Sequence, residues 1–149
     1  MSDWAIETVN FGQRFGANWA VKNLNLQVPQ GSVFGLLGEN GAGKSTTIQM
    51  LMGLLPPSEG HSRVLGLDPV RDEMGVKSRV GYVPEQYGFY EWMRVKEITA
   101  FVAAYHSNWN YALQKELIAE FSLNEENKVR ELSKGMRAKL AFSMSLLVD

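Results

Sequence analysis

Hydrophobic and polar residues alternate most clearly in residues 21–28. The apolar positions there are Leu24, Leu26 and Val28, and the polar positions between them are Asn23, Asn25 and Gln27. A repeat of two predicts a β-strand with one solvated face. After a Pro-Gln-Gly turn, the run Ser32–Leu37 is apolar without alternation, which predicts a second strand that is covered on both faces.

A glycine-rich loop, Gly38–Gly43, follows the second strand and leads into a predicted helix. Apolar residues at positions i, i+3, i+4 and i+7 indicate this helix; they are Ile48, Leu51, Met52 and Leu55. Gly53 and the pair Pro56-Pro57 are expected to end it. The sequence therefore predicts the order strand, glycine loop, helix.

Two more strands are predicted in the middle of the chain, at Arg63–Leu65 and Arg79–Val83. Between them, Asp68 and Pro69 are typical of a helix start. An aspartate accepts hydrogen bonds from free amide groups at a helix start, and a proline fits the first turn. We therefore expect a short helix between these two strands.

The pattern becomes helical from about Val95 onward. One predicted apolar face comprises Ile98, Phe101, Val102 and Tyr105. A second comprises Leu113, Leu117 and Phe121, in a helix that Asn108 is expected to cap. A last helix is expected from about Ser133 to the end of the chain, with Met136, Leu140, Met144 and Leu147 on one face. A strand at Leu146–Asp149 is the alternative, but those residues continue the helical repeat.

Composition excludes several classes of protein. The chain has 149 residues, 45% of them hydrophobic, which is enough to bury a core. With 15 Lys+Arg against 16 Asp+Glu, it has no basic excess that would predict direct binding to nucleic acid. It contains no cysteine, and its apolar runs are far shorter than the roughly 20 residues of a membrane helix. We expect a cytosolic domain without a signal peptide.

The strongest chemical signal is the sequence GENGAGKS at Gly38–Ser45, which fits the phosphate-binding pattern G-x-x-x-x-G-K-[ST]. Glycines allow backbone N–H groups to surround a phosphate, a lysine reaches the β- and γ-phosphates, and a serine hydroxyl binds Mg²⁺. The candidate nucleotide contacts are Asn40, Gly41, Ala42, Gly43, Lys44, Ser45 and Thr46. A flexible glycine loop with a solvated lysine is the alternative.

The sequence LSKGM at Leu132–Met136 indicates a second helix start that could hold an anion, with Ser133 as its cap and Gly135 in its first turn. The alternative is that Ser133 only caps its own helix. The basic residues Lys134, Arg137 and Lys139 are interpreted as a solvated helix face.

Together these motifs resemble the nucleotide-binding domain of ABC transporters over nearly the whole chain. GENGAGKS resembles the Walker A loop, Gln86 in GYVPEQ resembles the Q-loop glutamine, and LSKGM resembles the signature usually written LSGGQ. The resemblance implies an α/β fold with a P-loop NTPase (RecA-like) core, an N-terminal antiparallel β subdomain and an α-helical insertion. It implies a division into residues 1–86, 87–132 and 133–149, and a chain that ends before the Walker B segment.

The resemblance also implies roles for single residues. Lys44 and Gln86 are the expected catalytic residues, and Ser45 and Gln86 the expected Mg²⁺ contacts. Phe15 would stack on adenine, while Ser133 and Gly135 would contact the γ-phosphate held by a second domain. The alternatives are an ordinary edge or core aromatic for Phe15 and a surface amide for Gln86. Lys134 and Met136 depart from the signature.

The implied function is that of the ATP-binding subunit of an ABC transporter, with ATP and Mg²⁺ as ligands. Its implied partners are a transmembrane permease and a second nucleotide-binding domain, and its implied place is the cytoplasmic face of the membrane. The aromatic residues Tyr87, Phe89, Tyr90 and Trp92 are interpreted either as a docking surface for the permease or as core.

These 149 residues contain no apolar strand followed by Asp-Glu after the signature, so ATPase activity is expected only of the complete protein. Two alternatives are a soluble ABC-type ATPase that acts on nucleic acid or the ribosome, and a nucleotide-binding fragment without hydrolysis.

Overall fold

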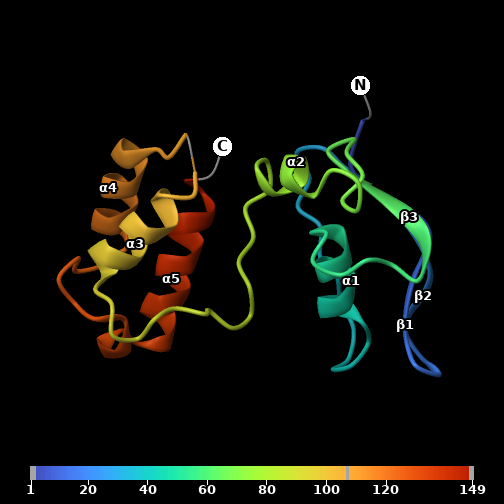
Figure 1. Cartoon of the computed structure of the whole chain (residues 1–149), viewed down its shortest axis with the longest axis horizontal. Helices are drawn as coiled ribbons and strands as arrows, with labels where there is room; N and C mark the ends of the chain where they lie inside the picture. The colour runs from blue at the N-terminus through green and yellow to red at the C-terminus, as the bar shows by residue number, and fades with distance from the viewer. Residues whose placement is uncertain (1–2, 107, 148–149) are drawn as a thin grey trace. The chain divides into compact units, whose positions relative to one another are not determined.

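A computed structural model describes residues 3–106 and 108–147, and the chain forms two compact units. The first unit ends at Lys77 and the second begins at Ser78. The first contains a small sheet with α1 beside it, and the second is helical (Figure 1). Among the described residues, no helix is long and apolar enough to cross a membrane. The three-part division inferred from the sequence stays a prediction.

The sheet of the first unit is antiparallel, with the strand order β2-β1-β3. β1 (Trp4–Phe15) and β2 (Asn18–Pro29) form a hairpin whose turn contains Gly16 at φ 60°, and β3 is Glu59–Val64. The predicted alternation in β2 is confirmed, because its asparagines are exposed while Val28 is buried. β1 was not predicted from the sequence, because shifts in its pairing near Phe11 interrupt the alternation of apolar and polar residues.

α1 (Lys44–Leu51) contacts β2 and β3. Gly53, at φ 70°, ends it as predicted: the Gly53 N–H bonds to the Met50 carbonyl and the Leu54 N–H to the Gln49 carbonyl. The predicted apolar face is wrong in part. Ile48 is exposed, and Leu55 lies beyond the helix end. The residues of α1 that are buried are Thr47, Met50 and Leu51.

Two predicted strands are absent. Ser32–Leu37 and Arg79–Val83 form no regular secondary structure. Val33, Phe34 and Leu37 are exposed and Leu36 is half-buried, so this apolar run is not covered on both faces. The physical reason is pairing: within the described parts of the chain, neither segment has a neighbouring strand to bond with.

The segment around Asp68 differs from the prediction in where its helix starts. Asp68 Oδ1 accepts hydrogen bonds from the N–H groups of Val70 and Arg71, which makes a turn. α2 (Glu73–Lys77) begins later, and its Gly75 N–H bonds to Asp72 Oδ1. The predicted strand Arg63–Leu65 is shifted as well, since β3 ends at Val64.

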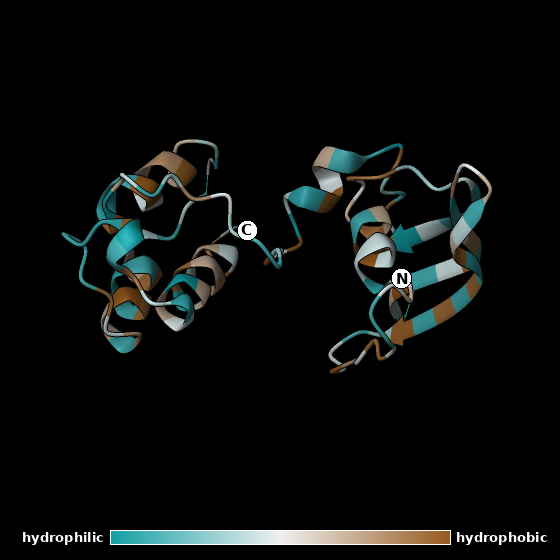
Figure 2. Ribbon diagram, turned by 90° about the horizontal axis from the view of Figure 1, so that it is seen from below, coloured by the Kyte–Doolittle hydropathy of each residue, from teal (hydrophilic) through white to brown (hydrophobic). Residues whose placement is uncertain are grey.

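The second unit consists of α3 (Val95–Ala103), α4 (Tyr111–Glu120), the short 3₁₀ helix η1 (Val129–Glu131) and α5 (Lys134–Ser145). Its core is a continuous apolar cluster to which all three α-helices contribute, and hydrophobic and hydrophilic residues mix along these helices in Figure 2. The predicted face of α5 is confirmed, because Leu140, Met144 and Leu147 are buried and Met136 packs against them.

Three predictions for the second unit are wrong. α4 is capped by Asn110, whose Oδ1 accepts from the Leu113 N–H, and not by Asn108. Phe101 and Tyr105 are exposed instead of lying on the core face with Ile98. α5 ends at Ser145, so the predicted helix does not continue through Leu146 and Leu147; these two residues do not form the alternative strand either, and residues 148–149 lie outside the described residues.

Glu126 joins the start of α3 to the turn before η1. Arg94 Nη1 and Lys96 Nζ each lie 2.5 Å from one of its carboxylate oxygens. The hydrogen bond from Lys96, followed by that from Arg94, lowers the pKa of Glu126 below its usual 4.5. The contribution of Glu126 to stability is therefore complete above pH 4.5 and is lost as the pH falls through the lowered pKa.

We expect Glu126→Gln to unfold at a lower urea concentration than the parent at neutral pH, and to differ less from it at acidic pH. The measurement is urea unfolding of the helices, followed by circular dichroism at both pH values. Glu125→Gln is the matched control, because the Glu125 side chain forms no ion pair within the described residues. If acid lowered the stability of the parent and of Glu126→Gln by the same amount, the assignment of this pH dependence to Glu126 would be wrong.

Candidate functional site

The glycine loop between residues 38 and 43 leads directly into α1. Gly41 and Gly43 have φ values of 85° and 84°, in the left-handed region that favours glycine. Gly43 also lies against β2: a Cβ atom added there would be 2.2 Å from the Ala20 carbonyl oxygen and 2.8 Å from Val21 Cγ2. Both the conformation and the close approach therefore require glycine at position 43.

The start of α1 has free backbone donors. The N–H groups of Lys44, Ser45 and Thr46 have no acceptor in the described chain, whereas Thr47 N–H bonds to the Gly43 carbonyl at 2.8 Å. Within α1, all of which is described, no acidic residue lies in the first turn. Free donors and the positive end of the helix dipole favour an anion at this point.

Lys44 lies along this loop. Its Nζ donates hydrogen bonds to the carbonyl oxygens of Gly38 and Glu39, both at 2.7 Å. No carboxylate in the described chain pairs with the ammonium group of Lys44, so its charge stays uncompensated. The loop thus carries a cation, free N–H groups and an exposed Ser45 hydroxyl, which suits a phosphate chain.

The residues around the loop also bear on Mg²⁺. The described chain holds no group of three His, Cys, Asp or Glu side chains that could hold a metal ion. Asn40 and Ala42 are exposed in the loop, and Thr46 is half-buried behind it. Ser45 offers a neutral hydroxyl, so a Mg²⁺ ion bound here would need phosphate oxygens as its anionic ligands. The residues present fit a metal that arrives with a nucleotide.

Phe15 ends β1 and is 54% exposed, which leaves its ring open to stacking and excludes the core alternative. It pairs with Asn18, two residues before Ala20, the residue that touches Gly43. At a strand rise of about 3.3 Å per residue, Asn18 is about 7 Å along β2 from this contact. Phe15 therefore lies near the end of the loop, where α1 begins.

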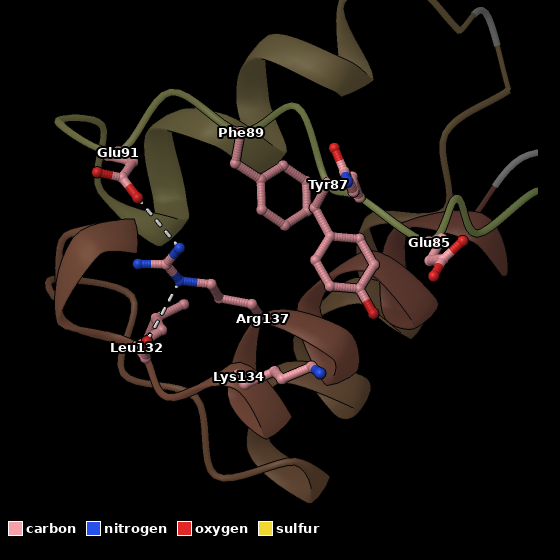
Figure 3. A pocket seen from close by; sticks show the side chains of 8 residues that line it. Glu85, Tyr87, Phe89, Glu91, Leu132, Lys134 and Arg137 are labelled. Carbon is pink, nitrogen blue, oxygen red and sulfur yellow. Dashed lines mark hydrogen bonds and ion pairs between the residues drawn. The ribbon is translucent and has the colours of Figure 1, made fainter.

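Three of the expected site residues lie in the second unit. Ser133 caps α5 through a 3.2 Å hydrogen bond from the Met136 N–H to its Oγ, as predicted, and Ser133 and Gly135 are exposed. Gln86 lines a pocket of about 400 Å³, together with Leu132, which precedes the cap of α5, and Lys134, the first residue of α5 (Figure 3). The second unit thus brings the Gln86 segment and the LSKGM segment together.

The aromatic residues that follow Gln86 divide into two groups. Phe89 packs against the core of the second unit, and its ring stacks on Tyr87 with centroids 5.6 Å apart. Trp92 is 66% exposed, and Tyr90, which contacts it, is exposed as well. Core packing therefore holds for Phe89, while Tyr90 and Trp92 are available to a partner.

The sequence analysis missed one arrangement in this pocket. Arg137, interpreted there as part of a solvated helix face, instead bonds to Glu91 Oε1 at 3.1 Å and to the carbonyls of Leu132 and Arg130. Glu91 and Arg137 are 46 positions apart, so no local pattern could reveal the pair. Lys139 is exposed, as that interpretation expects, and its Nζ lies 5.9 Å from the Phe121 ring centre.

Comparisons with known proteins find relatives over most of the chain. A family model described as "ABC transporter" matches residues 21–149. The uncharacterized ABC transporter ATP-binding protein YhaQ of Bacillus subtilis (strain 168) is 38% identical over 138 residues, 89% of this chain and 45% of the relative. The bacitracin transport ATP-binding protein BcrA of Bacillus licheniformis is 33% identical over 147 residues, 95% of this chain and 47% of the relative. The chain spans about half the length of these curated relatives.

Solved structures share the fold. An ATP-binding subunit of an ABC transporter matches with a TM-score of 0.83 at 25% identity, over 97% of this chain and 62% of that chain. The cbiO1 protein from Clostridium perfringens, described as part of the ABC transporter complex cbiONQ, matches with a TM-score of 0.79 at 19% identity, over 99% and 62%. These likenesses confirm the predicted P-loop NTPase fold class.

Proposed function

We propose that this chain, which belongs to the ABC transporter family, forms the ATP-binding part of a transporter that couples ATP binding and hydrolysis to substrate movement through a membrane permease. The observation that carries the proposal is the glycine loop with three free N–H groups at the start of α1. The relative named for bacitracin transport favours transport over an ATPase that acts on nucleic acid. The permease would hold the protein at the cytoplasmic face of the membrane.

The first unit would bind the nucleotide. The N–H groups at the start of α1 donate to phosphate oxygens, and Lys44 exchanges its carbonyl partners for the β- and γ-phosphates. Asn40, Gly41, Ala42, Gly43 and Thr46 shape this loop, and the exposed Phe15 ring stacks on adenine. The Ser45 hydroxyl would hold Mg²⁺, which supplies positive charge to the β- and γ-phosphates when bound.

The second unit would complete the site of another nucleotide-binding domain. Ser133 and Gly135 are exposed at the start of α5, where they can donate to a γ-phosphate held by a partner domain. Gln86, which is exposed and lines the pocket, would orient the attacking water and contact Mg²⁺. The 149 residues alone would bind ATP without hydrolysing it, because they contain no apolar strand followed by Asp-Glu after LSKGM, which would supply the acid for Mg²⁺ and the residue that positions the water.

The permease would dock on Tyr90 and Trp92 beside this pocket. Aromatic side chains that are exposed before binding and buried afterwards commonly contribute about 2 kcal/mol or more to an interface. We therefore expect Trp92→Ala to weaken permease binding about 30-fold. MgATP binding should not change, because the glycine loop belongs to the other unit.

The first test is co-purification of the chain with a coexpressed, tagged permease. Titration of the chain against the permease then gives the affinity. Tyr111→Ala is the matched control, since Tyr111 is 68% exposed at the start of α4 and makes no ring contact with Trp92. Equal losses in Trp92→Ala and Tyr111→Ala would exclude this docking surface. Retention of the permease by both variants would exclude it too.

A further inference from the structure

Arg137 joins the start of α5 to the residues at the end of η1 and to Glu91, which is 46 positions away in the sequence. It lies in the first turn of α5, and its side chain is 30% exposed. Nη1 donates to Glu91 Oε1 at 3.1 Å, Nε to the Leu132 carbonyl at 3.3 Å and Nη2 to the Arg130 carbonyl at 3.4 Å. Figure 3 shows the guanidinium group between Glu91 and Leu132.

The backbone supports the same connection. The Arg130 N–H bonds to the Glu91 carbonyl at 3.0 Å, and the Val129 N–H bonds to the Met93 carbonyl at 2.9 Å. The segment that carries Gln86 and Glu91 is therefore fixed at its far end to the residues just before Ser133. A displacement of this segment would therefore also move the residues just before the start of α5.

The position of Arg137 costs the helix some stability, because a cation in the first turn opposes the helix dipole. The carbonyls of Arg130 and Leu132, which surround the end of η1, accept no other side chain in the described chain. The guanidinium satisfies both carbonyls and also neutralises Glu91. A lysine has the charge but not the planar fork that contacts three acceptors at once.

We propose that Arg137 is a positioning residue that sets the place of Ser133 according to the position of the Gln86 segment. Its hydrogen bond to Glu91 makes its position depend on that segment. Its hydrogen bond to the Leu132 carbonyl fixes the residue that precedes the α5 cap. That Ser133 contacts a phosphate rests on the proposed function. The connection between Glu91 and Ser133 does not depend on it. The Glu91 side chain has no direct contact with Ser133 in the described chain; its carboxylate is joined to the start of α5 through Arg137, whereas the backbone of its segment is joined separately to η1.

The first test is amide hydrogen exchange at Met136, whose N–H bonds to Ser133 Oγ. In Glu91→Gln and Arg137→Lys we expect this amide to exchange about fivefold faster, the effect of a weakened helix cap. The exchange of Leu140, fully buried in the same helix, should stay constant. Glu85→Gln and Lys139→Ala are matched controls, one from the same pocket and one from the same helix. Unchanged exchange at Met136, or equal acceleration at Leu140, would overturn the proposal.

The second test separates positioning from folding. In the complete protein, of which these 149 residues form a part, assembled with its permease, Arg137→Lys and Glu91→Gln should lower kcat for ATP about fivefold and leave KM unchanged. The double variant should be no slower than either single variant. A raised KM with unchanged kcat, or additive losses, would overturn the proposal. Absence of ATPase in the parent would count against the proposed function, and the Met136 exchange would then decide the role of Arg137.

Discussion

Lys44→Ala is expected to weaken MgATP binding about 10- to 150-fold. The lysine ammonium has no carboxylate partner in the described chain, and only two neutral carbonyls accept its hydrogen bonds. Hydrogen bonds to charged groups are worth about 1.5–3 kcal/mol, and alanine removes the charge while keeping the backbone N–H of residue 44. The measurement is calorimetric titration of MgATP into parent and variant.

Lys77→Ala is the matched control for this titration. Lys77 belongs to the same unit and pairs with Glu73 on the surface of α2, so its loss should leave MgATP affinity unchanged. Equal affinity of parent and Lys44→Ala would show that the glycine loop does not hold the phosphates. Equal losses in the two lysine variants would point to net charge instead of a specific contact.

Gly43→Ala is expected to destabilise the first unit by about 2–5 kcal/mol and to abolish MgATP binding. Part of the cost arises because the residue keeps φ near 84°, where a side chain costs about 1–2 kcal/mol. The rest arises because the new Cβ atom would lie 2.2 Å from the Ala20 carbonyl oxygen, so α1 must move away from β2 at a cost of about 1–3 kcal/mol.

Gly31→Ala separates these two costs. Gly31 has φ 71° and no atom within 4 Å of an added Cβ, so it should lose only the conformational part, about 1–2 kcal/mol. Urea unfolding gives the free energies, and calorimetry gives the MgATP affinity. If Gly43→Ala were no less stable than Gly31→Ala, the close packing of α1 on β2 would be wrong.

The fold could be predicted where one face of an element is buried within its own unit. The alternation in β2 and the face of α5 with Leu140 and Met144 are of this kind. Ser32–Leu37 shows why an apolar run alone is not enough to predict a strand. Such a run forms a strand only where a neighbouring strand pairs with its backbone groups. Phe101 shows another limit, because helical periodicity does not reveal which apolar stripe faces the core.

The candidate site could be predicted to the extent that it is local in sequence. The positive φ of Gly41 and Gly43 and the cap at Ser133 follow from residue types within a few positions of each other. The contact of Gly43 with Ala20 and that of Arg137 with Glu91 join distant segments, and a basic residue in a helix looks solvated until its partners are known.

The most direct test of the central claim is a nuclear magnetic resonance titration of the isotope-labelled chain with MgATP. We expect the amide signals of Lys44, Ser45 and Thr46, whose N–H groups are free at the start of α1, to shift first and most. The amide of Leu117, buried in the second unit, should keep its position. Saturating MgATP that leaves the three loop amides unshifted, or shifts them no more than Leu117, would contradict nucleotide binding by this loop.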